Sequence, residues 1–241
     1  MRCVAVLTLL LFIGSESRAQ DESSRVNFGV KGGFSMSHFT DDVAPFDQPD
    51  ENFSAYKRSE RFSFVPGITM DVQLTRGFSF ITEVLYNSRG MGYSEKIPRL
   101  VIRDRDGREK SAYNYFDYKI NYLELPLILN YNFSKKTAKT YWQAYAGIAP
   151  AVLISSKTKI DYYTESDTRQ DTKSKLHDVR PFNHSFIAGI KSGDGLNTLY
   201  EGYVDLRVSY TLSPVFKQAL NDTGGNLNTR MYTFTLSVGL K

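Results

Sequence analysis

Charged side chains occupy polar positions in several segments where apolar and polar residues alternate. Seven of them fall on what alternation predicts to be one shared face: Lys31, Asp71, Glu83, Arg89, Glu124, Asp205 and Arg207. Groups of both signs at such positions pair in a hydrogen-bonded network, or they relay protons or line a path for a solute. The width of the space that these residues enclose decides between the two interpretations.

Three histidines are the only other candidates for catalysis: His38, His177 and His184. An outer-leaflet enzyme would need a histidine beside a serine or aspartate nucleophile or orienting group. No spacing links these histidines to such a partner, and no metal or cofactor motif occurs in the sequence. We therefore predict no catalytic residue, no cofactor and no enzymatic activity.

Period-two alternation shows which elements position these residues. In residues 232–240 every even position is large and apolar, and every odd position is Thr, Ser or Gly; residues 202–212 repeat the pattern. A strand has this pattern when one face meets an apolar phase and the other does not. Six further segments fit a strand: 26–37, 62–74, 78–90, 119–133, 141–154 and 184–191.

The connections between these segments alternate in length. Long ones cover 38–61, 91–117, 155–183 and 213–228, whereas short ones cover 75–77, 134–140 and 192–199. Outer-membrane barrels have long external loops and short periplasmic turns. We therefore predict an all-β, eight-stranded antiparallel up-and-down transmembrane β-barrel with periplasmic termini. A soluble periplasmic β-sandwich is the alternative.

A barrel of this size has an interior just wide enough for side chains to fill. The seven charged residues would then line the lumen as a structural polar network, because a lipid-facing Arg or Lys costs about 2–4 kcal/mol at the bilayer midplane. Within the long connections, residues 99–102 and 104–107 predict a further strand and a turn with glycine at positive φ. The polar stretch 155–180 predicts a mobile loop.

Aromatic residues near the ends of the expected strands predict two interfacial girdles; for the group near the long loops, a carbohydrate-binding or protein-binding patch is the alternative. The group near the short turns is Phe78, Phe133, Tyr141 and Trp142, and the group near the long loops is Tyr86, Tyr93, Tyr113, Tyr115, Phe116 and Tyr118. Six basic residues in the 91–117 connection could pair with lipopolysaccharide phosphates, or belong to an ordinary solvated loop: Lys96, Arg99, Arg103, Arg105, Arg108 and Lys110.

The N-terminus predicts a secretory signal peptide over residues 1–19, followed by a barrel domain over 20–241. Arg2 precedes an apolar run of about ten residues, and small residues at 17 and 19 predict cleavage after Ala19. Cys3, the only cysteine, would leave with the signal. A formal net charge of +4 and export both argue against a nucleic-acid partner.

Residues 122–129, with the sequence Tyr-Leu-Glu-Leu-Pro-Leu-Ile-Leu, are the most specific local feature. They resemble a strand of the PorT-like outer-membrane β-barrel proteins of Bacteroidetes, as do 28–34 and 78–86. The resemblance implies an integral outer-membrane barrel and, as an alternative, an accessory role in type IX protein secretion.

From the residues we expect a non-catalytic barrel that acts structurally or binds through its external loops. Expected partners are outer-membrane lipid and the barrel assembly machinery during insertion; lipopolysaccharide and an envelope protein are further candidates.

Overall fold

The computed structural model describes residues 26–41, 56–75, 77–103, 107, 109–134, 140–163, 169–194, 201–217 and 228–241. The predicted signal peptide lies outside these residues. Within them the chain forms ten strands and no helix: β1 Val26–Phe39, β2 Tyr56–Gln73, β3 Phe78–Arg103, β4 Glu109–Glu124, β5 Leu127–Asn132, β6 Thr140–Tyr163, β7 Arg169–Lys175, β8 Phe182–Asp194, β9 Gly202–Thr211 and β10 Met231–Leu240.

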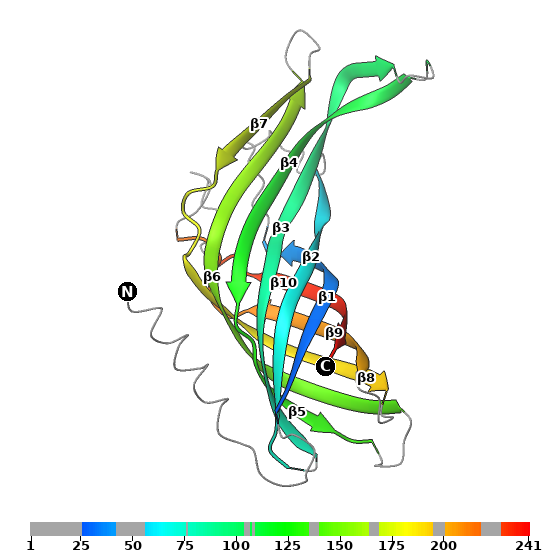
Figure 1. Cartoon of the computed structure of the whole chain (residues 1–241). Helices are drawn as coiled ribbons and strands as arrows, with labels where there is room; N and C mark the ends of the chain where they lie inside the picture. Colours follow the sequence, from blue (N-terminus) through cyan, green and yellow to red (C-terminus); the bar gives the residue numbers. More distant parts are fainter. Residues whose placement is uncertain are drawn as a thin grey trace.

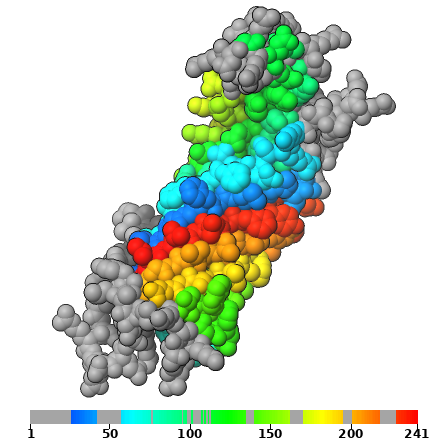
Figure 2. All heavy atoms as spheres, turned by 90° about the vertical axis from the view of Figure 1, so that its right-hand side faces the viewer, coloured from blue at the N-terminus to red at the C-terminus, as the bar shows by residue number. Residues whose placement is uncertain are grey.

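The sheet closes on itself because the first and last strands pair. Phe34 of β1 lies opposite Leu236 of β10, in an antiparallel register that runs from Val30 to Phe39. Figure 2 shows this seam, with β1 in blue beside β10 in red, followed by β9 and β8. All pairings are antiparallel, and apart from the closing β1–β10 pair the walls of the barrel follow one another in chain order, so the predicted up-and-down barrel is confirmed.

Eight walls make up the barrel, because β4 and β5 together form one wall and β7 lies outside the ring. β4 and β5 both pair with β3 on one side and with β6 on the other. The break falls at Leu125 and Pro126, since proline has no N–H to give to the ladder. The Leu125 N–H still donates to the Pro150 carbonyl at 2.8 Å, and the Glu83 N–H donates to the Pro126 carbonyl at 3.1 Å.

Side chains alternate between lipid and lumen along each wall. In β10, Phe234, Leu236 and Val238 are at least half exposed, whereas Ser237 is buried. β9 repeats the pattern, with Val204, Leu206 and Val208 exposed and the residues between them buried. Exposed apolar residues on the outside and buried polar residues on the inside are typical of a membrane barrel.

At one end of the barrel, consecutive strands are joined by short stretches of chain; we call it the turn end. Val26 and Lys241 lie there, as do the facing strand ends of β2 and β3, of β5 and β6, and of β8 and β9. In the first turn the Thr75 Oγ1 accepts hydrogen bonds from the N–H groups of Gly77 and Phe78, at 3.4 and 3.2 Å. These bonds satisfy backbone groups that would otherwise have no partner in the turn.

The opposite end carries a tall extension on one side only (Figure 1). β3 and β4 continue as a hairpin to Arg103 and Glu109, and Gly107 adopts a φ of 75°. This confirms the strand predicted over 99–102 and the positive φ predicted for the glycine; residues 104–106 of the predicted turn lie outside the described part of the chain. We call this end of the barrel the extended end.

The expectation of a loop over 155–180 is wrong for residues 155–163 and 169–175, which are strand; residues 164–168 lie outside the described part of the chain. β6 continues to Tyr163 and pairs with β7, from Lys157 opposite Lys175 to Tyr163 opposite Arg169. This hairpin is polar on both faces, so it lacks the apolar alternation by which the barrel strands were recognised.

Gly90 lies in β3 where the barrel continues into the extension. Its φ is 155°, and a Cβ there would come within 1.8 Å of the Tyr118 carbonyl oxygen. Only glycine allows the two backbones to approach so closely. No helix among the described residues is long and apolar enough to cross a membrane, a finding that does not bear on crossing by strands.

Candidate functional site

All seven charged residues singled out from the sequence are buried, each at 8% exposure or less. They come from five walls of the barrel: Lys31 from β1, Asp71 from β2, Glu83 and Arg89 from β3, Glu124 from β4, and Asp205 and Arg207 from β9. Their immediate neighbours on the same strands include exposed apolar residues such as Val30, Val84 and Leu206. The charged side chains therefore point into the lumen.

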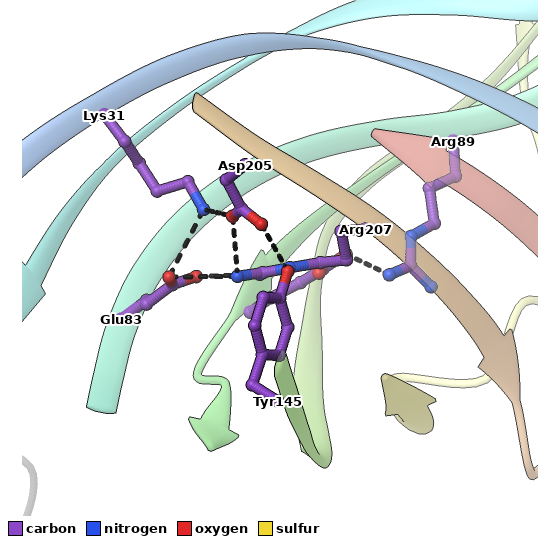
Figure 3. Close-up of polar contacts among 7 residues, drawn as sticks. Lys31, Glu83, Arg89, Tyr145, Asp205 and Arg207 are labelled. Atoms are coloured by element: carbon purple, nitrogen blue, oxygen red, sulfur yellow. Dashed lines mark hydrogen bonds and ion pairs between the residues drawn. The ribbon is translucent and has the colours of Figure 1, made fainter. Parts of the chain in front are cut away.

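Four of the seven meet in one cluster with a tyrosine (Figure 3). The Lys31 Nζ donates to Glu83 Oε1 at 3.2 Å and to Asp205 Oδ2 at 2.6 Å. The Arg207 guanidinium donates to both oxygens of Glu83, at 2.7 and 3.0 Å, and lies 3.3 Å from Asp205. Tyr145 donates to Asp205 at 2.5 Å and accepts from the Arg207 Nε at 3.0 Å. We call these five residues the central network.

The central network is balanced in charge and almost free of solvent. Two cations face two carboxylates, and the side chains of Lys31, Glu83 and Asp205 expose 1% or less. Bidentate pairing of a guanidinium with a carboxylate is among the stronger polar contacts in proteins. Removing one partner of such a pair costs about 3–5 kcal/mol, because the remaining charge stays buried without compensation.

The other three residues are not part of this cluster. Toward the extended end, Arg89 pairs with Glu124 at 2.7 Å and donates to the Ser185 Oγ at 3.1 Å. At the turn end, Asp71 lies 3.6 Å from the Nζ of Lys241. The structure therefore divides the predicted single set into three groups at different heights in the lumen.

Sequence reasoning missed three lumen residues that contact or adjoin the central network: Tyr145, Lys191 and Tyr203. The buried Lys191 ammonium lies 4.6 Å from the centre of the Tyr203 ring. The period-two alternation could have identified them, because each is buried next to at least one exposed apolar residue on its strand: Ala144 and Ala146 beside Tyr145, Ile190 beside Lys191, and Val204 beside Tyr203.

Gly189 leaves the space that Tyr145 occupies. A Cβ at Gly189 would come within 2.4 Å of the Tyr145 hydroxyl oxygen. The same arrangement recurs nearer the turn end, where a Cβ at Gly193 or Gly239 would collide with Tyr141 or Tyr203. Lumen tyrosines therefore pack directly against glycine backbones, a device that fixes the register of neighbouring strands.

Above the central network, toward the extended end, the lumen becomes apolar. A cluster of buried side chains fills it: Phe39, Met91, Tyr93, Tyr118, Ile120, Tyr122, Ala151, Val179, Val215, Phe216 and Met231. We call this set the apolar cluster. It comes from the inner faces of the strands and from the two connections that follow β7 and β9.

The apolar cluster corrects part of the girdle prediction. Tyr93 and Tyr118 belong to it and Phe116 packs against it, so these three rings do not face lipid. Tyr141 is also buried, because its neighbour Trp142 takes the outward position. Clustering along the sequence had suggested a girdle, but strand parity decides on which side of the wall each ring lies.

Residues 176–181 and 212–217, from the two connections that follow β7 and β9, fold into the mouth at the extended end and close it. Val179 and Phe216 form an isolated antiparallel bridge, and the Arg180 N–H donates to the Val215 carbonyl at 2.9 Å. The Phe216 ring stacks edge to face on Phe39, with centroids 5.7 Å apart. The lumen therefore contains two obstacles in series, the central network and the apolar cluster.

The structure does not bring the three histidines together. His38 of β1 lies opposite Tyr232, His184 of β8 lies opposite Pro150, and His177 is exposed in the connection after β7. Among the described residues no group of three His, Cys, Asp or Glu side chains is placed to hold a metal ion. Of the six basic residues of the 91–117 connection, Lys96 is exposed and the other five side chains lie outside the described part of the chain.

A closed eight-walled barrel with an apolar exterior and a charged interior defines the class of outer-membrane β-barrel proteins. Residues 18–217 match the family described as outer membrane protein beta-barrel domain, and the chain belongs to this family. It is an integral protein of the outer membrane.

Solved structures resemble this chain at low identity. Neisserial surface protein A is 10% identical, with 90% of this chain and 98% of that one covered and a TM-score of 0.39. Ail from Yersinia pestis is 8% identical, with 88% and 96% covered and a TM-score of 0.40. OprG from Pseudomonas aeruginosa is 10% identical, with 88% and 94% covered and a TM-score of 0.41. No curated protein matches the chain.

Proposed function

We propose that this protein is a closed, non-conducting barrel that works as a binding platform on the cell surface rather than as a pore or an enzyme. The observation that carries the proposal is the filled lumen. An ion-paired network crosses it, and a packed apolar cluster closes it toward the extended end. A path for ions would have to break both.

The extension supplies the platform. β2, β3, β4 and β6 are 18, 26, 16 and 24 residues long, whereas β9 and β10 have 10 each. A tilted strand of about 9–11 residues suffices to cross a bilayer. The excess length therefore forms a sheet that rises beyond the membrane, with an inner face that packs on the apolar cluster.

Conductance across a planar bilayer tests the closed lumen. The purified barrel is expected to give no steady conductance, while an open porin in the same bilayer gives stable steps. Steady, reproducible steps from this protein would overturn the proposal. A brief, irregular signal that disappears when the folded band is purified would not count as conduction.

We propose that the extended end faces outward and both termini face the periplasm, which the short turn-end connections support. Single cysteines at Val101, exposed on the extension, and at Gln73, exposed at the turn end, test this orientation. On intact cells a membrane-impermeant maleimide should label V101C and spare Q73C. Labelling of Q73C but not of V101C would mean that the barrel has the opposite orientation in the membrane.

An accessory role in type IX secretion is the second candidate, and the resemblance of residues 122–129 to PorT-like barrels supports it. Deleting the gene should then retain secreted substrates in the periplasm. Normal secretion by the deletion strain would remove this candidate and leave the closed barrel untouched.

A further inference from the structure

Three lysines stand side by side on three adjacent strands of the extension. Lys119 of β4 lies opposite Lys157 of β6, and Lys157 lies opposite Lys175 of β7. Residues directly opposite each other share a face of the sheet, with Cβ atoms about 4.5–5.5 Å apart. We call these three residues the lysine row; Figure 1 shows β7 beside the upper part of β6.

The lysine row faces away from the lumen. Ser156 and Thr158, the neighbours of Lys157 along β6, are both buried, so Lys157 itself points outward. Lys157 and Lys175 are exposed and Lys119 is half-buried.

None of the three ammonium groups has a carboxylate within ion-pair distance among the described residues. The acids nearest in register pair with other cations, Asp117 with Arg61 and Asp161 with Lys159. Like charges placed directly opposite each other destabilise a sheet unless a counter-ion lies between them. The row is therefore complementary to an anion that the chain does not itself supply.

The position of the row relative to the lipid indicates which anion. Along the outward face of β4 and β6 the aliphatic side chains end at Leu123 and Ile154, both about half exposed; on β4 two exposed tyrosines, Tyr115 and Tyr113, follow only beyond Lys119. A neutral polar level follows, where the buried Asn121 amide donates to the Oγ of the half-buried Ser155 at 2.7 Å. The lysine row comes next, three to four residues beyond the last apolar side chain.

At about 3.3 Å per residue and a tilt of about 40°, the lysine row lies about 8–10 Å above the last apolar level. Headgroups occupy about 5–8 Å on each side of the hydrocarbon core, and lysine stems are long enough to reach into that layer. The outward face thus passes from apolar to neutral polar to cationic in the order in which a bilayer passes from acyl chain to phosphate.

We propose that the lysine row binds the phosphates of a phosphorylated glycolipid in the outer leaflet. Three ammonium groups across about 10 Å match two phosphates on one sugar headgroup, and each can donate hydrogen bonds to phosphate oxygens. The choice of an outer-leaflet glycolipid as the ligand depends on the outward orientation of the extended end proposed above. Binding itself is a property of the purified chain.

The test compares a row variant with a matched control. The row variant is K119Q/K157Q/K175Q; the control, K57Q/R58Q/K217Q, removes the same charge from three exposed basic residues outside the row. Both are folded in detergent, checked by heat-modifiable migration, and titrated with bisphosphorylated lipid A and with its dephosphorylated form. Native mass spectrometry reads the bound fraction.

The row variant should bind bisphosphorylated lipid A about a hundredfold more weakly than the unmodified chain, while the control changes little. The dephosphorylated form should bind weakly to all three proteins. Millimolar inorganic phosphate should not displace the lipid.

Three results would overturn the proposal. The row variant could bind bisphosphorylated lipid A as tightly as the unmodified chain, or the control could lose as much affinity as the row variant. The unmodified chain could also bind the phosphorylated and dephosphorylated lipids equally well. If the row variant does not fold, K157Q alone is tested and should weaken lipid A binding about fivefold. An unchanged lipid A affinity of K157Q would also overturn the proposal. Maleimide labelling of the turn end on intact cells would instead overturn the orientation, so the two failures are distinguishable.

Discussion

Replacing Glu83 by glutamine removes the carboxylate that joins the two cations of the central network. Glu83 accepts one hydrogen bond from Lys31 and two from Arg207, and its side chain is fully buried. In E83Q only Asp205 remains to face Lys31 and Arg207, so one buried positive charge loses its compensation. We expect the free energy of unfolding to fall by about 3–5 kcal/mol.

Urea unfolding in lipid vesicles, followed by heat-modifiable gel migration, measures this change. E60Q is the matched control, because Glu60 lies exposed on β2, and its effect should stay within about 0.5 kcal/mol. A double-mutant cycle with R207Q sharpens the test. The double variant restores a balance between Lys31 and Asp205, so it should cost about 0.5–3 kcal/mol less than the sum of the two single changes.

Two results would refute this reasoning. A loss below about 1 kcal/mol for E83Q would mean that water or ions, and not the protein, compensate these charges. Strict additivity in the cycle would mean that Glu83 and Arg207 do not stabilise each other, whatever the distance between them.

Three further changes test other parts of the structure in the same unfolding assay. G189A places a Cβ against the Tyr145 ring and should destabilise by about 1–3 kcal/mol, whereas G202A, where a Cβ meets only an atom 3.8 Å away, should not; equal effects would contradict the packing argument. L206R puts a cation on a lipid-facing position near mid-strand and should cost about 2–4 kcal/mol, and a neutral result would mean that Leu206 does not face hydrocarbon. F216A removes a ring from the apolar cluster and should lower the free energy of unfolding by about 3–5 kcal/mol. Its conductance should stay at zero, because the central network still crosses the lumen. New steady conductance would show that the apolar cluster alone closes the barrel.

The barrel strands were predictable because the membrane constrains every second residue. Residues such as Phe234, Leu236 and Val238 have to be apolar wherever they face lipid, so period-two alternation is visible in the sequence alone. The same constraint made the charged face visible. It does not operate beyond the membrane, which explains why the β6–β7 hairpin was mistaken for a mobile loop.

Which charges meet could not be read from the sequence. Lys31 and Asp205 are 174 residues apart, and their contact depends on strand tilt and on the register of walls between them. The alternation of apolar and polar residues predicted that Arg89 and Arg207 share a face. It could not predict that they lie at different heights in the lumen, where they pair with different carboxylates. The inward fold of Val215 and Phe216 has no periodic signal either, since it comes from a connection.

The wide separation of the central network along the chain has a consequence for assembly. Lys31 and Glu83 are synthesised early, whereas Asp205 and Arg207 arrive with β9, the strand before the last. Until β9 docks, the earlier pair lacks two of its partners, and an unclosed intermediate must keep those charges hydrated. Because Lys31 of β1 and Asp205 of β9 lie on either side of β10, we expect their ion pair to form only when β10 pairs with β1, so that the central network stabilises the closed barrel and not the open intermediate.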